Sequence, residues 1–170
     1  MTSYLAKGGN AIRSVLEILD RKSKIESDDP DGIKEKRSIN GHIELNNVLF
    51  CYPTRPEQII LNGLSLRIDV GATMALVGPS GSGKSTIIGL IERFYDPLSG
   101  SVEIDGKDIK IYNLRCLRSH IALVSQEPTL FAATIQDNIV YGNDNATETE
   151  IISDATLAKA HDFIRYNLTK

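Results

Sequence analysis

A short run of glycine, serine and lysine residues carries the residue types that hold phosphate groups. It reads Gly78-Pro79-Ser80-Gly81-Ser82-Gly83-Lys84-Ser85-Thr86 and fits the pattern G-x-x-x-x-G-K-[S/T]. Glycines lack a Cβ, so the backbone N–H groups of such a loop can converge on an anion. Lys84 then reaches the β- and γ-phosphates of a nucleoside triphosphate, and the Ser85 hydroxyl binds Mg²⁺. The run therefore predicts a phosphate-binding loop.

The segments on either side have the patterns that this motif requires. Residues 73–77 form a continuous apolar run, which predicts a parallel strand covered on both faces. Apolar residues between 87 and 94 recur at helical spacing, so a helix should follow the loop and present its positive end to the phosphates. A short helix near 113–119 leads to a second apolar run at 121–124, the second candidate for a central parallel strand. Further on, Thr147-x-x-Glu150 predicts a capping box at a helix start.

Other segments predict antiparallel strands in front of this core. Apolar and polar residues alternate at 43–45 and at 64–68, as they do in half-buried strands. Residues 102–104 predict a short strand, and the Asp-Gly pair at 105–106 predicts a hairpin turn. The fold class is therefore α/β, a P-loop core with an N-terminal antiparallel β-subdomain.

The first forty residues have a different character. Apolar residues at helical spacing predict an amphipathic helix over 5–19, whose apolar stripe needs a partner. Residues 20–37 are rich in charge and contain a proline and a glycine, which is typical of a linker. We therefore expect helix and linker in residues 1–40 and the α/β domain in residues 41–170.

The composition restricts the partners. The chain has 19 Lys or Arg and 22 Asp or Glu among 170 residues, a formal net charge of −3. This charge gives no positive field for nucleic acid, so no nucleic-acid partner is expected. Two cysteines are too few for a disulfide framework and lack metal-ligand spacing. No apolar run reaches the roughly 18 residues of a membrane span, so we expect no transmembrane segment in this chain and a soluble isolated chain.

Several motifs together resemble one family. The phosphate loop is preceded by Phe50-Cys51-Tyr52-Pro53-Thr54-Arg55-Pro56 and followed by Ile91-Glu92-Arg93-Phe94-Tyr95-Asp96-Pro97 and Ser125-Gln126-Glu127-Pro128-Thr129-Leu130-Phe131. From about residue 41 onward this combination resembles the nucleotide-binding domain of ATP-binding-cassette (ABC) exporters, in the P-glycoprotein-like multidrug-resistance subfamily of plant type. The helix and linker also look like that subfamily's connection to a membrane domain. The resemblance implies an ATPase that binds ATP and Mg²⁺ and drives export across a membrane.

The resemblance also implies roles for single residues. Tyr52 matches an aromatic residue that stacks on adenine, although a tyrosine at a strand end can also simply pack on its domain. Gln126 matches a glutamine that touches Mg²⁺ and the attacking water, with a polar loop residue as the alternative. Lys84 and Gln126 are then the catalytic residues. The nucleotide would be held by Tyr52, Gly78, Ser80, Gly81, Ser82, Gly83, Lys84, Ser85 and Thr86, and the metal by Ser85 and Gln126.

The expected partners are a second nucleotide-binding domain and the membrane domains of an exporter. The segment from Glu127 to Phe131 resembles the part that meets the membrane domain. Leu130 and Phe131 would then be exposed apolar residues, and the alternative is that they belong to the core. In a full transporter the domain would lie on the cytoplasmic face of a membrane, which we expect to be the plasma membrane.

Later motifs of the family do not occur in these 170 residues. No apolar run after Gln126 ends in Asp-Glu, and no Leu-Ser-Gly-Gly-Gln signature is present. We therefore expect a domain truncated before the signature and Walker B motifs, which binds Mg-ATP weakly without turnover. Two other functions stay open: a non-catalytic truncated product that associates with an intact transporter, and a small soluble P-loop kinase or GTPase. The kinase or GTPase would need a second acidic Mg²⁺ ligand or a base-recognition motif, and we find neither.

Overall fold

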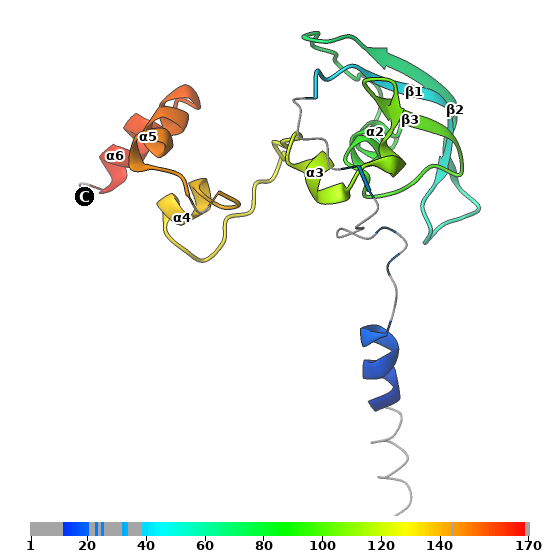
Figure 1. The fold of residues 1–170 in the computed structure, drawn as a ribbon, viewed down its shortest axis with the longest axis horizontal. Helices are drawn as coiled ribbons and strands as arrows, with labels where there is room; N and C mark the ends of the chain where they lie inside the picture. The colour runs from blue at the N-terminus through cyan, green and yellow to red at the C-terminus, as the bar shows by residue number, and fades with distance from the viewer. Residues whose placement is uncertain are drawn as a thin grey trace, which may run out of the picture. The chain divides into compact units, whose positions relative to one another are not determined.

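The computed structural model describes residues 12–20, 23, 25, 32, 33, 39–143 and 145–168, and Figure 1 shows the fold as a ribbon. The chain divides into two compact units, Met1–Ala122 and Leu123–Lys170. The first unit contains the phosphate loop and the second contains Gln126. Each unit is described by itself below.

An antiparallel sheet forms the frame of the first unit. Its strands are β1 (Ile43–Cys51), β2 (Ile59–Ile68), β3 (Ser99–Ile104) and β4 (Lys107–Asp108), in the order β2-β1-β3-β4. The pairings β1–β2, β1–β3 and β3–β4 are all antiparallel, which confirms the strands expected from alternation. The hairpin turn at 105–106 is confirmed too, since Asp105 and Gly106 have φ angles of 52° and 73°, as a tight primed turn requires.

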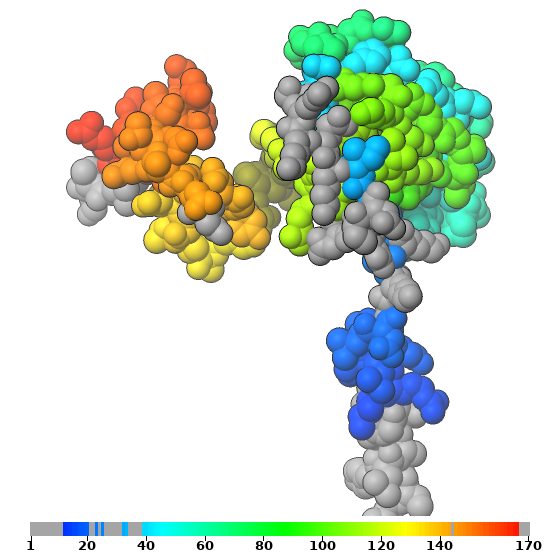
Figure 2. Space-filling model, in the orientation of Figure 1, coloured from blue at the N-terminus to red at the C-terminus, as the bar shows by residue number. Residues whose placement is uncertain are grey.

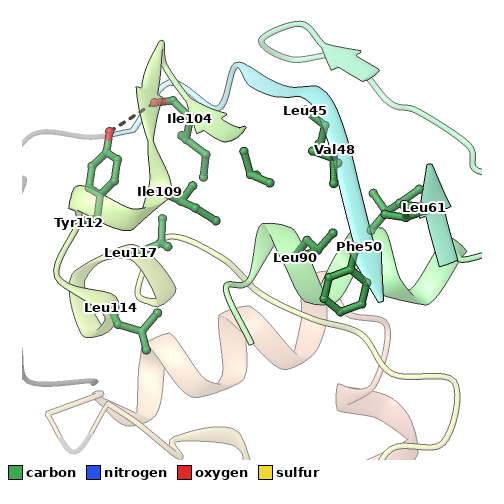
Figure 3. Close-up of a cluster of buried hydrophobic side chains, with 12 residues drawn as sticks. Leu45, Val48, Phe50, Leu61, Leu90, Ile104, Ile109, Tyr112, Leu114 and Leu117 are labelled. Atoms are coloured by element: carbon green, nitrogen blue, oxygen red, sulfur yellow. Dashed lines mark hydrogen bonds between the residues drawn. The ribbon is translucent and has the colours of Figure 1, made fainter. Parts of the chain in front are cut away.

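Helix α2 (Lys84–Ile91) packs on this sheet and closes the core. Leu90 of α2 is fully buried and meets side chains of the central strand β1. The core continues under the short helices η1 (Ile109–Ile111) and α3 (Leu114–Arg118), the second of which confirms the helix expected near 113–119. Figure 3 shows the cluster, which includes Leu45, Val48, Phe50, Leu61, Leu90, Ile104, Ile109, Tyr112, Leu114 and Leu117. In the space-filling view the segments from 40 to 120 form one continuous mass (Figure 2).

Two arginines fasten the end of α2 to the segment that contains η1 and α3. Arg93, at a φ of 53°, donates from its guanidinium to the carbonyl oxygens of Ile109 and Tyr112. Arg118 donates to the carbonyl oxygens of Glu92 and Arg93, and its guanidinium lies 4.4 Å from the ring centroid of Phe94. These contacts satisfy carbonyl groups that the helix end leaves free, which holds the C-terminal end of α2 against the domain.

The two apolar runs expected as central parallel strands do not join the sheet. Residues 73–77 and 121–124 have no strand structure. Val77 is 92% exposed and Val124 is 95% exposed, although Leu76 and Ile121 pack against the core. The expectation of buried strands is therefore wrong for this structure. An apolar run indicates a tendency to be covered, whereas a parallel strand also needs hydrogen-bonded neighbours, and neither run is paired in a described ladder.

The N-terminal helix is confirmed for the part that is described. Residues 12–19 are helical, and the stripe formed by Ile12, Val15, Leu16 and Leu19 is at least half exposed. Residues 5–11 and most of the expected linker lie outside the described residues. Ile33 is an exception within that linker, because it forms a parallel bridge with Tyr112 and exchanges backbone hydrogen bonds with Ile111 and Asn113. No helix in the described part of the chain is long and apolar enough to cross a membrane.

The second unit consists of short helices. They are α4 (Ile135–Ile139), α5 (Glu148–Leu157) and α6 (His161–Leu168). The predicted capping box of Thr147 and Glu150 is confirmed at the start of α5. A second capping box, formed by Thr134 and Asp137, begins α4. Among the described side chains of this unit only Ala155 is buried, so the unit has little core of its own.

Candidate nucleotide-binding site

The phosphate loop ends at the N-terminus of α2, as the motif predicts. Gly83 is the N-cap residue and adopts a left-handed conformation with a φ of 88°, and Gly81 has a φ of 81°. The N-cap offers no side-chain hydrogen bond, and the first turn of α2 contains no acidic residue. The N–H groups of this turn therefore keep their capacity to bind an anion, and the helix dipole favours negative charge there.

Two glycines of the loop lie close to neighbouring side chains. A Cβ at Gly83 would lie 2.9 Å from Cδ2 of Leu61 and 3.2 Å from Cγ2 of Ile60, so the loop is seated directly on β2. A Cβ at Gly78 would lie 2.8 Å from the Ser82 hydroxyl oxygen. The loop is thus held closely by the sheet on one side and folded closely on itself on the other.

The ammonium group of Lys84 lies across the loop. Its Nζ donates to the carbonyl oxygens of Gly78, at 2.9 Å, and Pro79, at 2.7 Å, and lies 3.3 Å from the Ser82 hydroxyl. All three acceptors are neutral. A phosphate oxygen carries charge and makes a stronger hydrogen bond with an ammonium group than a carbonyl does. A phosphate oxygen within reach of Lys84 Nζ would therefore compete favourably with these neutral acceptors.

The two hydroxyl residues after Lys84 differ in their surroundings. Ser85 is exposed at the start of α2, whereas Thr86 is 4% exposed. The Thr86 hydroxyl lies 2.7 Å from the hydroxyl of Tyr52, at hydrogen-bond distance. Ser80 and Ser82, expected to hold nucleotide as well, are exposed in the loop. The structure thus brings the hydroxyl of Tyr52 to Thr86, the residue that ends the motif, a contact that the motif does not reveal.

Tyr52 follows directly on the last residue of β1 and is half-buried. Its ring makes T-shaped contacts with Phe50 and with Tyr95. The tyrosine therefore packs on its domain and also stands beside the phosphate loop, so the two interpretations of this residue are compatible. Its contact with adenine stays a prediction.

Gln126 and residues 127–131 lie in the second unit and are exposed. The meeting of Gln126 with the phosphate loop therefore stays a prediction. Leu130 is 73% exposed and Phe131 is 57% exposed, which favours the expectation of an apolar surface over that of a core. The ring of Phe131 stacks on Tyr141 with centroids 4.4 Å apart.

The side chain of Asn138 holds the backbone around Phe131 in place. This role of Asn138 was not identified from the sequence. Its amide oxygen accepts from the N–H of Phe131, at 2.8 Å, and its nitrogen donates to the carbonyl oxygens of Phe131 and Thr134. The Thr-x-x-Asp spacing of Thr134 and Asp137 is the sequence signal that could have located the start of α4 and hence Asn138.

The side chains expected to hold a metal fit Mg²⁺ in kind. Ser85 and Gln126 offer a hydroxyl and an amide oxygen, which are hard oxygen ligands. The described residues contain no group of three or more His, Cys, Asp or Glu side chains that could bind a metal by themselves.

The motif G-x-x-x-x-G-K-[S/T], followed by a helix with an uncapped N-terminus, is the phosphate-binding motif of P-loop nucleotide-binding domains. The family model described as "ABC transporter" matches residues 61–169, and the chain belongs to the ABC transporter family.

Curated relatives agree with this assignment. ABC transporter B family member 15 of Arabidopsis thaliana is 60% identical over 166 residues, which is 96% of this chain and 13% of the relative. ABC transporter B family member 1 of the same plant is 58% identical over 158 residues, 93% of this chain and 12% of the relative. The chain thus spans about an eighth of the length of these relatives. The resemblance to a plant-type branch of the ABC transporters is confirmed.

Proposed function

We propose that this chain binds Mg-ATP as part of the ATP-binding domain of an ABC exporter. The observation that carries the proposal is the phosphate loop, in which Lys84 Nζ lies against the carbonyl oxygens of Gly78 and Pro79 and the N-terminus of α2 has no side-chain cap. Backbone N–H groups, a helix dipole and an ammonium group together provide the positive potential that a triphosphate requires.

The other residues act around this centre. Ser85 supplies its hydroxyl to Mg²⁺, and Gln126 adds an amide oxygen and orients the attacking water. Tyr52 places its ring against the adenine base, because a flat ring holds a purine without demanding hydrogen bonds. Mg²⁺ neutralises charge on the phosphates when it is bound.

The 170 residues alone should hold nucleotide weakly and turn it over poorly. Hydrolysis needs a group that positions or deprotonates water, and this sequence has no Asp-Glu pair after Gln126 to supply it. In the complete transporter the domain would act with a second nucleotide-binding domain at the cytoplasmic face of a membrane. Glu127, Leu130 and Phe131 are the residues that we propose contact the membrane domains, because the last two expose large apolar side chains.

Calorimetric titration with ATP and Mg²⁺ tests the proposal. The Lys84→Ala variant should bind about tenfold to a hundredfold more weakly than the unaltered chain, because it loses hydrogen bonds between charged groups. Lys110→Ala removes an exposed lysine of η1 in the same unit and serves as the matched control, with unchanged affinity expected. Equal affinity of the unaltered chain and the Lys84→Ala variant would refute the assignment.

A further inference from the structure

Three aromatic rings meet near the end of β1. The ring of Tyr52 lies 5.1 Å from that of Phe50, with an angle of 82° between their planes. The same ring lies 5.3 Å from that of Tyr95, with an angle of 86°. Phe50 and Tyr95 also touch, with centroids 5.6 Å apart. Edge-to-face contacts depend on ring orientation, so the two neighbours together fix the plane of the Tyr52 ring.

The other end of Tyr52 is held as well. Its hydroxyl lies 2.7 Å from Oγ1 of Thr86, a buried residue in the first turn of α2. The ring and the hydroxyl are therefore both restrained by the protein itself. A side chain that is restrained in advance loses less conformational freedom when a ligand arrives, which strengthens binding.

Of the two rings that contact Tyr52, Tyr95 lies in a different position from Phe50. Phe50 is 2% exposed and belongs to the hydrophobic core, where its loss would disturb the whole domain. Tyr95 is half-buried, and its ring lies beside α2, where a Cβ added at Gly89 would be 3.8 Å from Cδ2 of the ring. Tyr95 therefore connects the ring of Tyr52 to the helix that begins at the phosphate loop.

We propose that Tyr95 is a positioning residue for recognition of the nucleotide base. It holds the Tyr52 ring in the orientation in which this ring packs on adenine, and it has no part in the loop that holds the phosphates. The proposal rests on the proposed function, in which Tyr52 contacts the base. It predicts that loss of the Tyr95 ring weakens binding of the base and leaves binding of the phosphates unchanged.

The test compares two ligands in titrations of the full chain with Mg²⁺ present. ATP carries base and phosphates, whereas inorganic tripolyphosphate carries a phosphate chain alone, so the ratio of the two affinities isolates base recognition. Tyr95→Leu should lower the affinity for ATP about threefold to tenfold and leave that for tripolyphosphate unchanged. Tyr95→Phe keeps the ring contact and should keep the ratio. Tyr141→Leu, in the second unit, is the matched control and should also keep the ratio.

Two results would overturn the proposal. One is an equal loss for both ligands in Tyr95→Leu, which indicates general damage to the domain. The other is an unchanged ratio in Tyr95→Leu while Tyr52→Leu lowers it. If Tyr52→Leu itself leaves the ratio unchanged, the base contact in the proposed function fails, and the proposal fails with it. Tyr95→Met, whose unbranched and flexible side chain adapts to an irregular space, replaces Tyr95→Leu if circular dichroism shows that the leucine variant is unfolded.

Discussion

At the scale of single residues, Gly83 meets two demands at once. Its φ of 88° lies in the left-handed region, which residues with a Cβ adopt at a cost. A Cβ at this position would also be 2.9 Å from Leu61 on β2. With glycine here, the loop lies this close to β2 without displacing the side chains of Leu61 and Ile60.

We expect Gly83→Ala to destabilise the chain and to weaken nucleotide binding. The left-handed backbone costs about 1 kcal/mol, and displacement of the loop from β2 adds to this. Gly106→Ala is the matched control, because Gly106 has a φ of 73° and open space around its Cβ position. Denaturant unfolding of both variants measures the difference. If Gly83→Ala lowers the free energy of unfolding no more than Gly106→Ala does, the close approach of the loop to β2 does not contribute to stability.

The contact between Tyr52 and Thr86 is a feature of single residues that the sequence did not predict. The phosphate motif is recognisable in the sequence because the backbone geometry and charge of the loop determine its residue types. The hydroxyl contact joins residues 34 positions apart, and no local pattern predicts such a pair. The loop and the helix that follows it were therefore predictable from the sequence, and the contacts around Tyr52 were not.

At the scale of elements, the capping box at the start of α5 responds to pH. The N–H of Thr147 donates to the carboxylate of Glu150 at 2.8 Å, and the Thr147 hydroxyl donates at 2.7 Å. These hydrogen bonds, the backbone one first, lower the pKa of Glu150 below its ordinary value. Because the folded-state pKa is lowered, the box stabilises α5 fully above the ordinary pKa of a glutamate, and this stabilisation is lost as the pH falls through the lowered pKa.

An NMR titration of the Glu150 carboxyl carbon checks this expectation. The midpoint in the unaltered chain should lie below that of an ordinary glutamate. Thr147→Ala should move the midpoint only part of the way back, because the backbone N–H remains and is the larger cause. A midpoint at or above the ordinary glutamate value in the unaltered chain would be inconsistent with the box.

The elements differ in how far the sequence predicted them. Strands β1 and β2 were predictable because one face is buried and the other exposed, which leaves an alternating pattern. Helix α2 was predictable from apolar spacing and helix α5 from its cap. The apolar runs at 73–77 and 121–124 were misinterpreted as buried strands, because apolar character alone does not supply the hydrogen-bonded neighbours that a strand requires.

At the scale of the whole chain, the buried side chains are unevenly distributed. The cluster of buried apolar residues lies between Leu45 and Leu117, within the first unit. Among the described side chains after residue 122, only Ala155 is buried. Apolar burial is the dominant favourable contribution to folding, so the two units should differ in local stability.

Hydrogen exchange followed by mass spectrometry measures this difference. Amides of β1 and α2 should exchange slowest, because they belong to the core. Amides of α4, α5 and α6 should exchange faster, because few apolar side chains are buried around them. Equal protection of α5 and β1 would show that the second unit gains stability from contacts other than its own core.

The central claim is that the loop at 78–86 and the start of α2 hold the phosphates of ATP. Two-dimensional NMR of the ¹⁵N-labelled chain, titrated with Mg-ATP, tests it directly because each backbone N–H reports its own surroundings. The account predicts that the largest amide shifts occur at Gly81, Gly83, Lys84 and Ser85, and that they disappear in the Lys84→Ala variant at the same ligand concentration. Largest shifts elsewhere in the chain, or unchanged loop amides at saturating Mg-ATP, would contradict the account.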